Sequence, residues 1–223
     1  MSVKRLGIAL VASLALAAVF AGSAFATATT TKSFWREAGT KLSSGTTKAA
    51  KCSAAENFIL RGTIAGAEAE IKATTLECPS GDVIKQEGEQ AIATGTLKLS
   101  GLTVVKPAGC KTNASITTKA LTAKTFMEGT TVYTKIQPTT ETTFANVPLT
   151  ECAAEGTYPV KGSVFGKASS STGTEAQLVP STFSGAINST AGGSLTLGTS
   201  PATISGVANN ELVSGAKYGA NES

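Results

Sequence analysis

The sequence predicts an all-β fold, either an antiparallel β-sandwich or a partly open β-barrel, stapled by two disulfides. Threonine and other β-branched residues run through the whole chain with glycine between them, which favours strands. No sustained apolar period of three to four residues occurs beyond the first 26 residues, so no long helix is predicted there. Turn-forming residues recur about every ten residues, as they do in sandwiches and barrels.

The first 26 residues have the features of a signal peptide. Lys4 and Arg5 precede an apolar run over 6–20, which is short for a membrane-spanning helix, and Ala24-Phe-Ala26 matches a cleavage site. We expect cleavage after Ala26 and a secreted or extracytoplasmic mature chain that begins at Thr27. Loss of the two basic residues lowers the formal net charge from +4 to +2. Neither nucleic-acid binding nor a transmembrane helix in the mature chain is expected.

The mature chain is predicted to hold a loose leader over 27–33, one β-rich domain over 34–206, and a tail or short helix over 207–223. Strand patterns in the domain are β-branched runs or alternation of polar and apolar residues. They cover 58–64, 68–76, 94–105, 116–127, 131–136, 143–149, 182–187, 193–197 and 202–207. Trp35, the only tryptophan, is expected to plug the core rather than to form a binding platform.

A stretch near the start of this domain recurs one hundred residues later. Cys52–Gly66 (CSAAENFILRGTIAG) and Cys152–Gly166 (CAAEGTYPVKGSVFG) align without a gap. Cysteine, alanine and two glycines are identical, and five further positions carry chemically similar residues. We interpret the two stretches as an internal duplication of one β-rich unit.

The four cysteines, an even number in an exported chain, predict two disulfides. Metal ligation is not expected, because the chain has neither a C-x-x-C motif nor a histidine. The duplication makes Cys52 and Cys152 equivalent, so a pseudo-two-fold axis would let them bond and would leave Cys78 to pair with Cys110. The rival pairing, Cys52 with Cys78, follows if a hairpin centred near Ala65-Gly66 brings its two flanks together. We favour the first pairing.

The motifs together resemble a group of exported β-rich proteins of soil actinobacteria. The residues that carry the resemblance are Trp35, the four cysteines, Phe58-x-Leu-x-Gly62, Ile116-Thr-Thr-Lys-Ala-Leu121 and Tyr158-Pro-Val-Lys-Gly-Ser-Val-Phe-Gly166. The resemblance covers most of the mature chain through short motifs. It implies export and a β-rich fold. No activity is known for the group, so the resemblance assigns no functional residue.

The chain lacks the side chains on which most hydrolases depend. It has no histidine, and Asp82 is its only aspartate, so histidine-based catalysis and paired aspartates are excluded. Ser214-Gly-Ala-Lys217 fits S-x-x-K but lacks the partner motifs of that family of sites. Glutamates two residues apart share a strand face, as a glycosidase would need, but a solvated face explains them better. These pairs are Glu68 with Glu70 and Glu87 with Glu89. We therefore expect no enzyme and no cofactor.

Two functional classes remain. A structural or adhesive protein of the cell envelope or its surroundings needs only a stable β domain, and this is the function we expect. The alternative is an extracytoplasmic carrier of a small apolar or sugar-like ligand in a β cavity, with Trp35, Tyr133 or Tyr158 at its wall. A filled core favours the first class and a pocket favours the second. The expected partner is accordingly a cell surface or a small molecule.

Overall fold

The computed structural model describes residues 32–79, 81–128, 131–168, 179–184 and 195–221. Every regular element in these ranges is a β-strand, and all the strand pairs are antiparallel, which confirms the all-β prediction. Residues 1–26, the predicted signal peptide, lie outside the described part. Within that part, no helix has the length and apolar character needed to cross a membrane.

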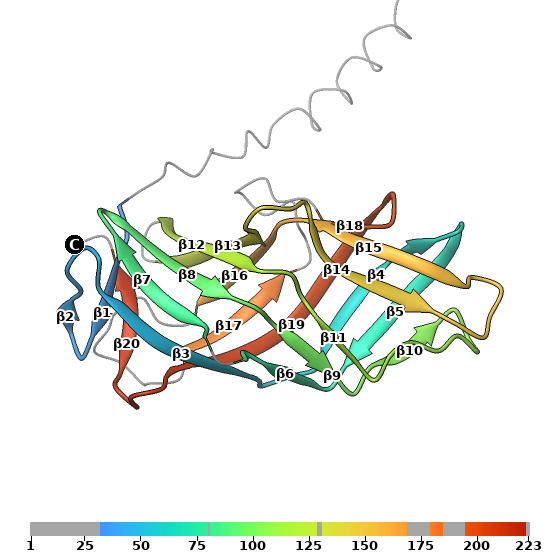
Figure 1. Cartoon of the computed structure of the whole chain (residues 1–223), viewed down its shortest axis with the longest axis horizontal. Coiled ribbons are helices and arrows are strands. Elements are labelled where there is room, and N and C mark those ends of the chain that lie inside the picture. The colour runs from blue at the N-terminus through green and yellow to red at the C-terminus, as the bar shows by residue number, and fades with distance from the viewer. Residues whose placement is uncertain (1–31, 80, 129–130, 169–178, 185–194, 222–223) are drawn as a thin grey trace, which may run out of the picture.

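Eight strands close into a ring, so one half of the molecule is a closed barrel (Figure 1). Each strand is hydrogen-bonded to the next, and the last is bonded to the first. In ring order they are β3 (Thr47–Ala54), β7 (Val83–Glu87), β8 (Gln90–Gly95), β12 (Leu121–Glu128), β13 (Thr131–Pro138), β16 (Val164–Ala168), β17 (Val179–Ser184) and β19 (Ser200–Leu212).

The long strand β19 joins this barrel to the second half of the molecule. Residues 206–212 of β19 pair within the ring, whereas residues 200–205 pair with β18 and β4. The remaining strands of the second half enclose a separate, larger apolar core. They are β4 (Phe58–Ile64), β5 (Ala67–Ala73), β6 (Thr75–Glu77), β9 (Lys98–Ser100), β10 (Thr103–Lys106), β11 (Ser115–Thr117), β14 (Thr143–Leu149), β15 (Gly156–Gly162) and β18 (Leu195–Leu197).

A three-stranded sheet covers the far end of the barrel. It consists of β2 (Thr40–Lys41), β1 (Phe34–Glu37) and β20 (Tyr218–Asn221), in that order. Trp35 of β1 is only 8% exposed, and its ring centroid lies 5.8 Å from that of Tyr218, so it plugs the core as predicted. The predicted tail or short helix over 207–223 was wrong. Its first residues complete β19 and its last described residues form β20, because β20 finds a partner in β1 at the opposite end of the chain.

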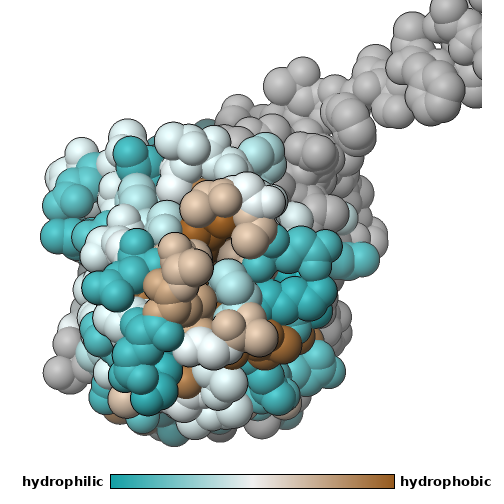
Figure 2. Space-filling model, turned by 90° about the vertical axis from the view of Figure 1, so that its right-hand side faces the viewer, coloured by the Kyte–Doolittle hydropathy of each residue, from teal (hydrophilic) through white to brown (hydrophobic). Residues whose placement is uncertain are grey.

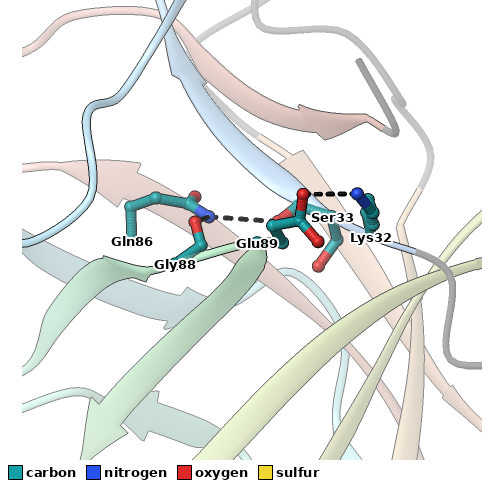
Figure 3. A network of polar contacts seen from close by, with 5 residues as sticks. All are labelled: Lys32, Ser33, Gln86, Gly88 and Glu89. Atoms are coloured by element: carbon teal, nitrogen blue, oxygen red, sulfur yellow. Dashed lines mark hydrogen bonds and ion pairs between the residues drawn. The ribbon is translucent and has the colours of Figure 1, made fainter.

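A buried polar network fixes this sheet to the barrel (Figure 3). The Gln86 side chain is fully buried. Its Oε1 accepts a hydrogen bond from the backbone N–H of Trp35 at 2.8 Å. Its Nε2 donates to the carbonyl oxygens of Ser33 at 3.2 Å and Gly88 at 3.0 Å. An ion pair between Lys32 and Glu89 lies beside the network at the surface. Gln86 therefore provides hydrogen-bond partners for three backbone groups, two from residues 33–35 and one from the turn after β7.

The disulfides are Cys52–Cys78 and Cys110–Cys152, so the favoured pairing was wrong and its rival was right about Cys52. Ser53 of β3 lies opposite Glu77 of β6, which places Cys52 opposite Cys78 in the same ladder. The β4–β5 hairpin, which turns at Ala65 and Gly66, is nested inside that ladder. The second bridge lies next to the paired residues Lys111 and Thr150.

The observed pairing also changes how much stability each disulfide is expected to contribute. The bridged cysteines are 26 and 42 residues apart, so each bond closes a loop of moderate size. Chain-entropy arguments give roughly 3.5 to 4 kcal/mol for loops of these lengths. The two bonds therefore stabilise the fold almost equally, whereas in the symmetric pairing the long loop would have contributed about 1 kcal/mol more than the short one.

The two copies of the repeated stretch build different structures. Cys52 lies within β3, whereas Cys152 lies in the turn region that follows β14. Gly66 occupies a hairpin turn with φ of +82°, whereas Gly166 lies inside β16 opposite Thr134. The two cysteines are therefore not related by an axis, which is why the symmetry argument for the disulfides failed.

We predict that Gln86→Ala lowers the free energy of unfolding by roughly 2–4 kcal/mol, because it leaves buried backbone groups without partners. Urea unfolding of the purified protein measures the change. Gln137→Ala, a substitution at an exposed residue of β13, serves as the control and is expected to have almost no effect. Equal losses for the two variants would contradict the role assigned to Gln86.

Candidate functional site

Small residues line part of the interior of the barrel. An eight-stranded barrel is just wide enough for bulky side chains to fill it or for one small ligand to occupy it. Here alanine and glycine stand at many of the inward-facing positions, and a cavity of about 160 Å³ remains. The small lining residues are Ala50, Ala93, Gly95, Ala123, Gly166 and Ala208. We call this space the barrel cavity.

Larger apolar side chains close the two ends of the barrel cavity. At the end covered by the three-stranded sheet, Trp35 and Tyr218 line it together with Ile84 and Val132. The Trp35 indole N–H donates to the Ile92 carbonyl oxygen at 2.8 Å, which holds the ring in place. At the opposite end the lining includes Leu76, Leu97, Leu121 and Ile136.

One carboxylate enters the barrel cavity. Asp82, which immediately precedes β7, is 9% exposed, and its Oδ1 accepts a hydrogen bond from the Thr96 N–H at 2.9 Å. A Cβ on Gly95 would overlap the Asp82 carboxyl group, so the carboxyl occupies the space that a side chain on inward-facing Gly95 would fill. Burial raises the pKa of Asp82 more than the hydrogen bond from Thr96 lowers it. The glycine therefore makes room for a buried acid.

Exposed and half-buried residues belong to the wall of the barrel cavity beside this acid. Strand β3 pairs with β7 over residues 47–49 and with β6 at Ser53; between these pairs the Ala50 N–H donates to the Asp82 carbonyl oxygen at 2.9 Å, and the Cys52–Cys78 disulfide joins the strands. The exposed Lys51 and the half-buried Cys78 line the cavity here. Lys51 does not neutralise Asp82, because its Nζ lies 2.8 Å from Glu211 Oε2.

A second cavity, of about 110 Å³, lies in the other half of the molecule. We call it the apolar cavity, because Thr118 is the only polar residue in its lining within the described part of the chain. Figure 2 views the end of the molecule at which β4, β5, β14 and β15 lie. Apolar side chains gather around a hollow in the middle of this face, and hydrophilic side chains surround them. Aliphatic lining residues that keep partial exposure are Leu60, Leu97, Leu99, Leu102, Ile116, Ile136 and Ile204.

The two cavities lie end to end inside the molecule. Leu76, Leu97 and Ile136 line both of them. The partition between the cavities is therefore a single layer of side chains. Unlike the barrel cavity, the apolar cavity has no charged residue among the lining residues that are described.

Of the three aromatic residues predicted to face a ligand, only Trp35 lines a cavity. Tyr158 packs against the larger core, and its hydroxyl donates to the Ala154 carbonyl oxygen at 3.0 Å. Tyr133 stacks on Phe126 with ring centroids 5.7 Å apart. Sequence reasoning did not select Asp82 and Tyr218 as site residues. The only available signal was that Asp82 is the sole aspartate.

The residues considered for catalysis lie on the surface. Each of the paired glutamates forms an ion pair with a basic residue; the partners are Lys106 for Glu68, Arg61 for Glu70, Lys85 for Glu87 and Lys32 for Glu89. Ser214 is exposed, and its hydroxyl accepts a hydrogen bond from the Ala216 N–H at 3.3 Å. In the described ranges, no group of three or more cysteine, aspartate or glutamate side chains is placed to hold a metal ion.

Comparison with known proteins finds no match among family models, curated proteins or solved structures.

We predict that Asp82→Asn stabilises the protein at neutral pH. Because the folded-state pKa of Asp82 is raised, the stability linked to its protonation is complete below the unfolded-state pKa of about 3.9 and is lost as the pH rises through the folded-state value. The asparagine carries no charge and keeps an acceptor for the Thr96 N–H. Its free energy of unfolding should exceed that of the natural protein at pH 7, and the difference should shrink near pH 3.

Denaturant unfolding at the two pH values tests this prediction. Glu56→Gln is the matched control, because it makes the same kind of change, from an acid to its amide, at an exposed residue. The control is expected to leave stability unchanged at neutral pH. A loss of stability in Asp82→Asn at pH 7 would contradict the assignment of Asp82 as a buried, destabilising acid.

Proposed function

We propose that the protein is a non-catalytic, extracytoplasmic binding protein that carries a small apolar molecule in the apolar cavity. The observation that supports this most strongly is the cavity lining, in which aliphatic and aromatic side chains surround the space and Thr118 is the only polar residue among those that the structure describes. Such a wall favours apolar ligands through burial of their surface. A sugar would lose its hydrogen bonds to water here and find almost no replacements, so the sugar-like ligand considered above fits less well.

The cavities distinguish this function from a structural or adhesive one. A protein that serves only as a stable scaffold gains from a filled core, because each void forfeits packing contacts. This chain leaves two internal spaces and places half-buried aliphatic residues around one of them. The structural or adhesive role needs neither feature. We therefore prefer the carrier, which was the alternative in the sequence analysis.

The extracytoplasmic part of the proposal is supported by the disulfides and by the N-terminal pattern. Two disulfides in one domain are typical of proteins outside the reducing cytosol. The apolar run over 6–20 and Ala24-Phe-Ala26 have the pattern of a cleaved signal. The non-catalytic part is supported by the lack of histidine and by the surface ion pairs of the glutamates considered above.

We predict that protein recovered outside the cytoplasm of an expressing bacterium begins at Thr27. Edman sequencing or intact mass of that fraction identifies the N-terminus. Ala26→Arg, which spoils the small-residue cleavage pattern, should leave the precursor uncleaved. A recovered protein that retains Met1 would contradict the export proposal and would leave the cavity proposal intact.

We predict that toluene binds in the apolar cavity. Addition of toluene to the purified protein should shift the methyl NMR signals of lining residues such as Leu60, Val147 and Ile204, and should raise the melting temperature. Ala145→Leu places three more carbon atoms in the lining and should abolish these shifts. Ala120→Leu, the same change at an exposed residue, should leave them unchanged.

Circular dichroism establishes that both variants keep the β-sheet signal of the natural protein. Toluene-induced shifts that persist in Ala145→Leu would place the ligand elsewhere. An absence of shifts in the natural protein for toluene, hexane and cyclohexane alike would overturn the carrier proposal and favour a structural or adhesive role.

A further inference from the structure

Asp82 differs from the other acidic residues of the molecule. Nine glutamates form ion pairs with lysine or arginine, and all nine have partly exposed side chains. Asp82 is buried, and in the described part of the chain its only side-chain hydrogen bond is the one that Oδ1 accepts from Thr96. Oδ2 has no protein partner there and keeps some exposure, so it is open to a partner from the cavity or the solvent. A buried carboxylate without a cationic partner is costly, so its position in a cavity wall calls for a partner from outside.

The lining of the barrel cavity indicates the chemistry of the bound molecule beyond the group that contacts Asp82. Among the described residues of the lining, Asp82 and Lys51 are charged, and Thr94, Thr134 and Asn210 are polar without charge. Most of the wall is alanine, glycine and aliphatic side chains, and the Trp35 and Tyr218 rings close the end that the three-stranded sheet covers. An occupant that satisfies both the wall and the acid has an apolar body and one positively charged hydrogen-bond donor.

The volume limits the size of the occupant. An apolar protein cavity of about 150 Å³ is large enough for benzene. The barrel cavity, at about 160 Å³, is of the same size. The apolar body therefore has on the order of six to nine non-hydrogen atoms.

We propose that the barrel cavity binds a small organic cation, in which an ammonium group donates a hydrogen bond to Asp82 Oδ2 and an apolar body fills the space bounded by the alanine and glycine residues. Entry on the Lys51 side would pass beside the Cys52–Cys78 disulfide, because the exposed Lys51 belongs to the cavity wall there. Lys51 stays paired with Glu211 and does not compete for the acid. This site is separate from the apolar cavity, and each can exist without the other.

The test compares three probes of similar shape: benzylamine, which is protonated at neutral pH, benzyl alcohol and toluene. Trp35 lines the barrel cavity and is the only tryptophan, so its fluorescence reports occupancy of this cavity. Benzylamine should bind the natural protein about tenfold more tightly than benzyl alcohol, as expected for a charge-assisted hydrogen bond. In Asp82→Asn this preference should fall to less than about threefold.

Two further variants complete the test, one that fills the barrel cavity and one surface control. Ala123→Leu, which fills the barrel cavity, should abolish the fluorescence response to benzylamine and leave the toluene-induced NMR shifts of the apolar cavity in place. Glu56→Gln should leave the affinity for benzylamine unchanged. Equal affinities for benzylamine and benzyl alcohol in the natural protein, or an unchanged preference in Asp82→Asn, would overturn the proposal. Both results are independent of whether toluene binds the apolar cavity.

Discussion

The structure depends on the closure of eight strands into a ring. A closed ring leaves no edge among its members, and the number of strands fixes the width of the interior. The chain meets this constraint with antiparallel pairs alone, and β19 completes the ring by pairing with both β17 and β3. The same strand continues into the second half, where it pairs with β4 and β18. One strand therefore holds both halves in a common frame.

Once the width is set, the inward-facing residues decide whether the interior is full. Near the three-stranded sheet the chain uses Trp35, Ile84 and Leu212, and the space is packed. Towards the middle it uses alanine and glycine at Ala93, Gly95 and their neighbours, and the space stays open. The buried Gln86 network and the two disulfides hold the surrounding wall. We infer that the rigid wall keeps the side chains from collapsing into the cavities.

The predictable part of the fold follows from local patterns. The β-branched composition indicated strands, and Ala65-Gly66 indicated a hairpin that the structure contains. The disulfide pairing could not be derived in the same way, because the repeated residues at Cys52 and Cys152 suggested a symmetry that the strand pairing does not have. Likewise, the alignment equates Gly166 with Gly66 of the hairpin turn, but Gly166 lies inside β16 between its partners on β13 and β17.

The candidate site depended on information that the sequence does not display. Ala50, Ala93, Ala123 and Ala208 come from four different strands, so only the ring order reveals that they face one space. Asp82 was noticed only for its rarity, and its role depends on Gly95 making room for the carboxyl group. Trp35 was correctly expected in the core, but its place at one end of a cavity follows from the pairing of β1 with β20.

The central claim is that the interior contains two separate spaces that small molecules can enter. Crystals of the protein equilibrated with xenon gas test it most directly, because xenon occupies apolar cavities of this size and is visible in electron density. We predict one xenon site among Ala93, Ala123 and Ala208, and a second among Leu60, Val147 and Ile204. Crystals with no xenon at either position would contradict the account and show that the interior is filled.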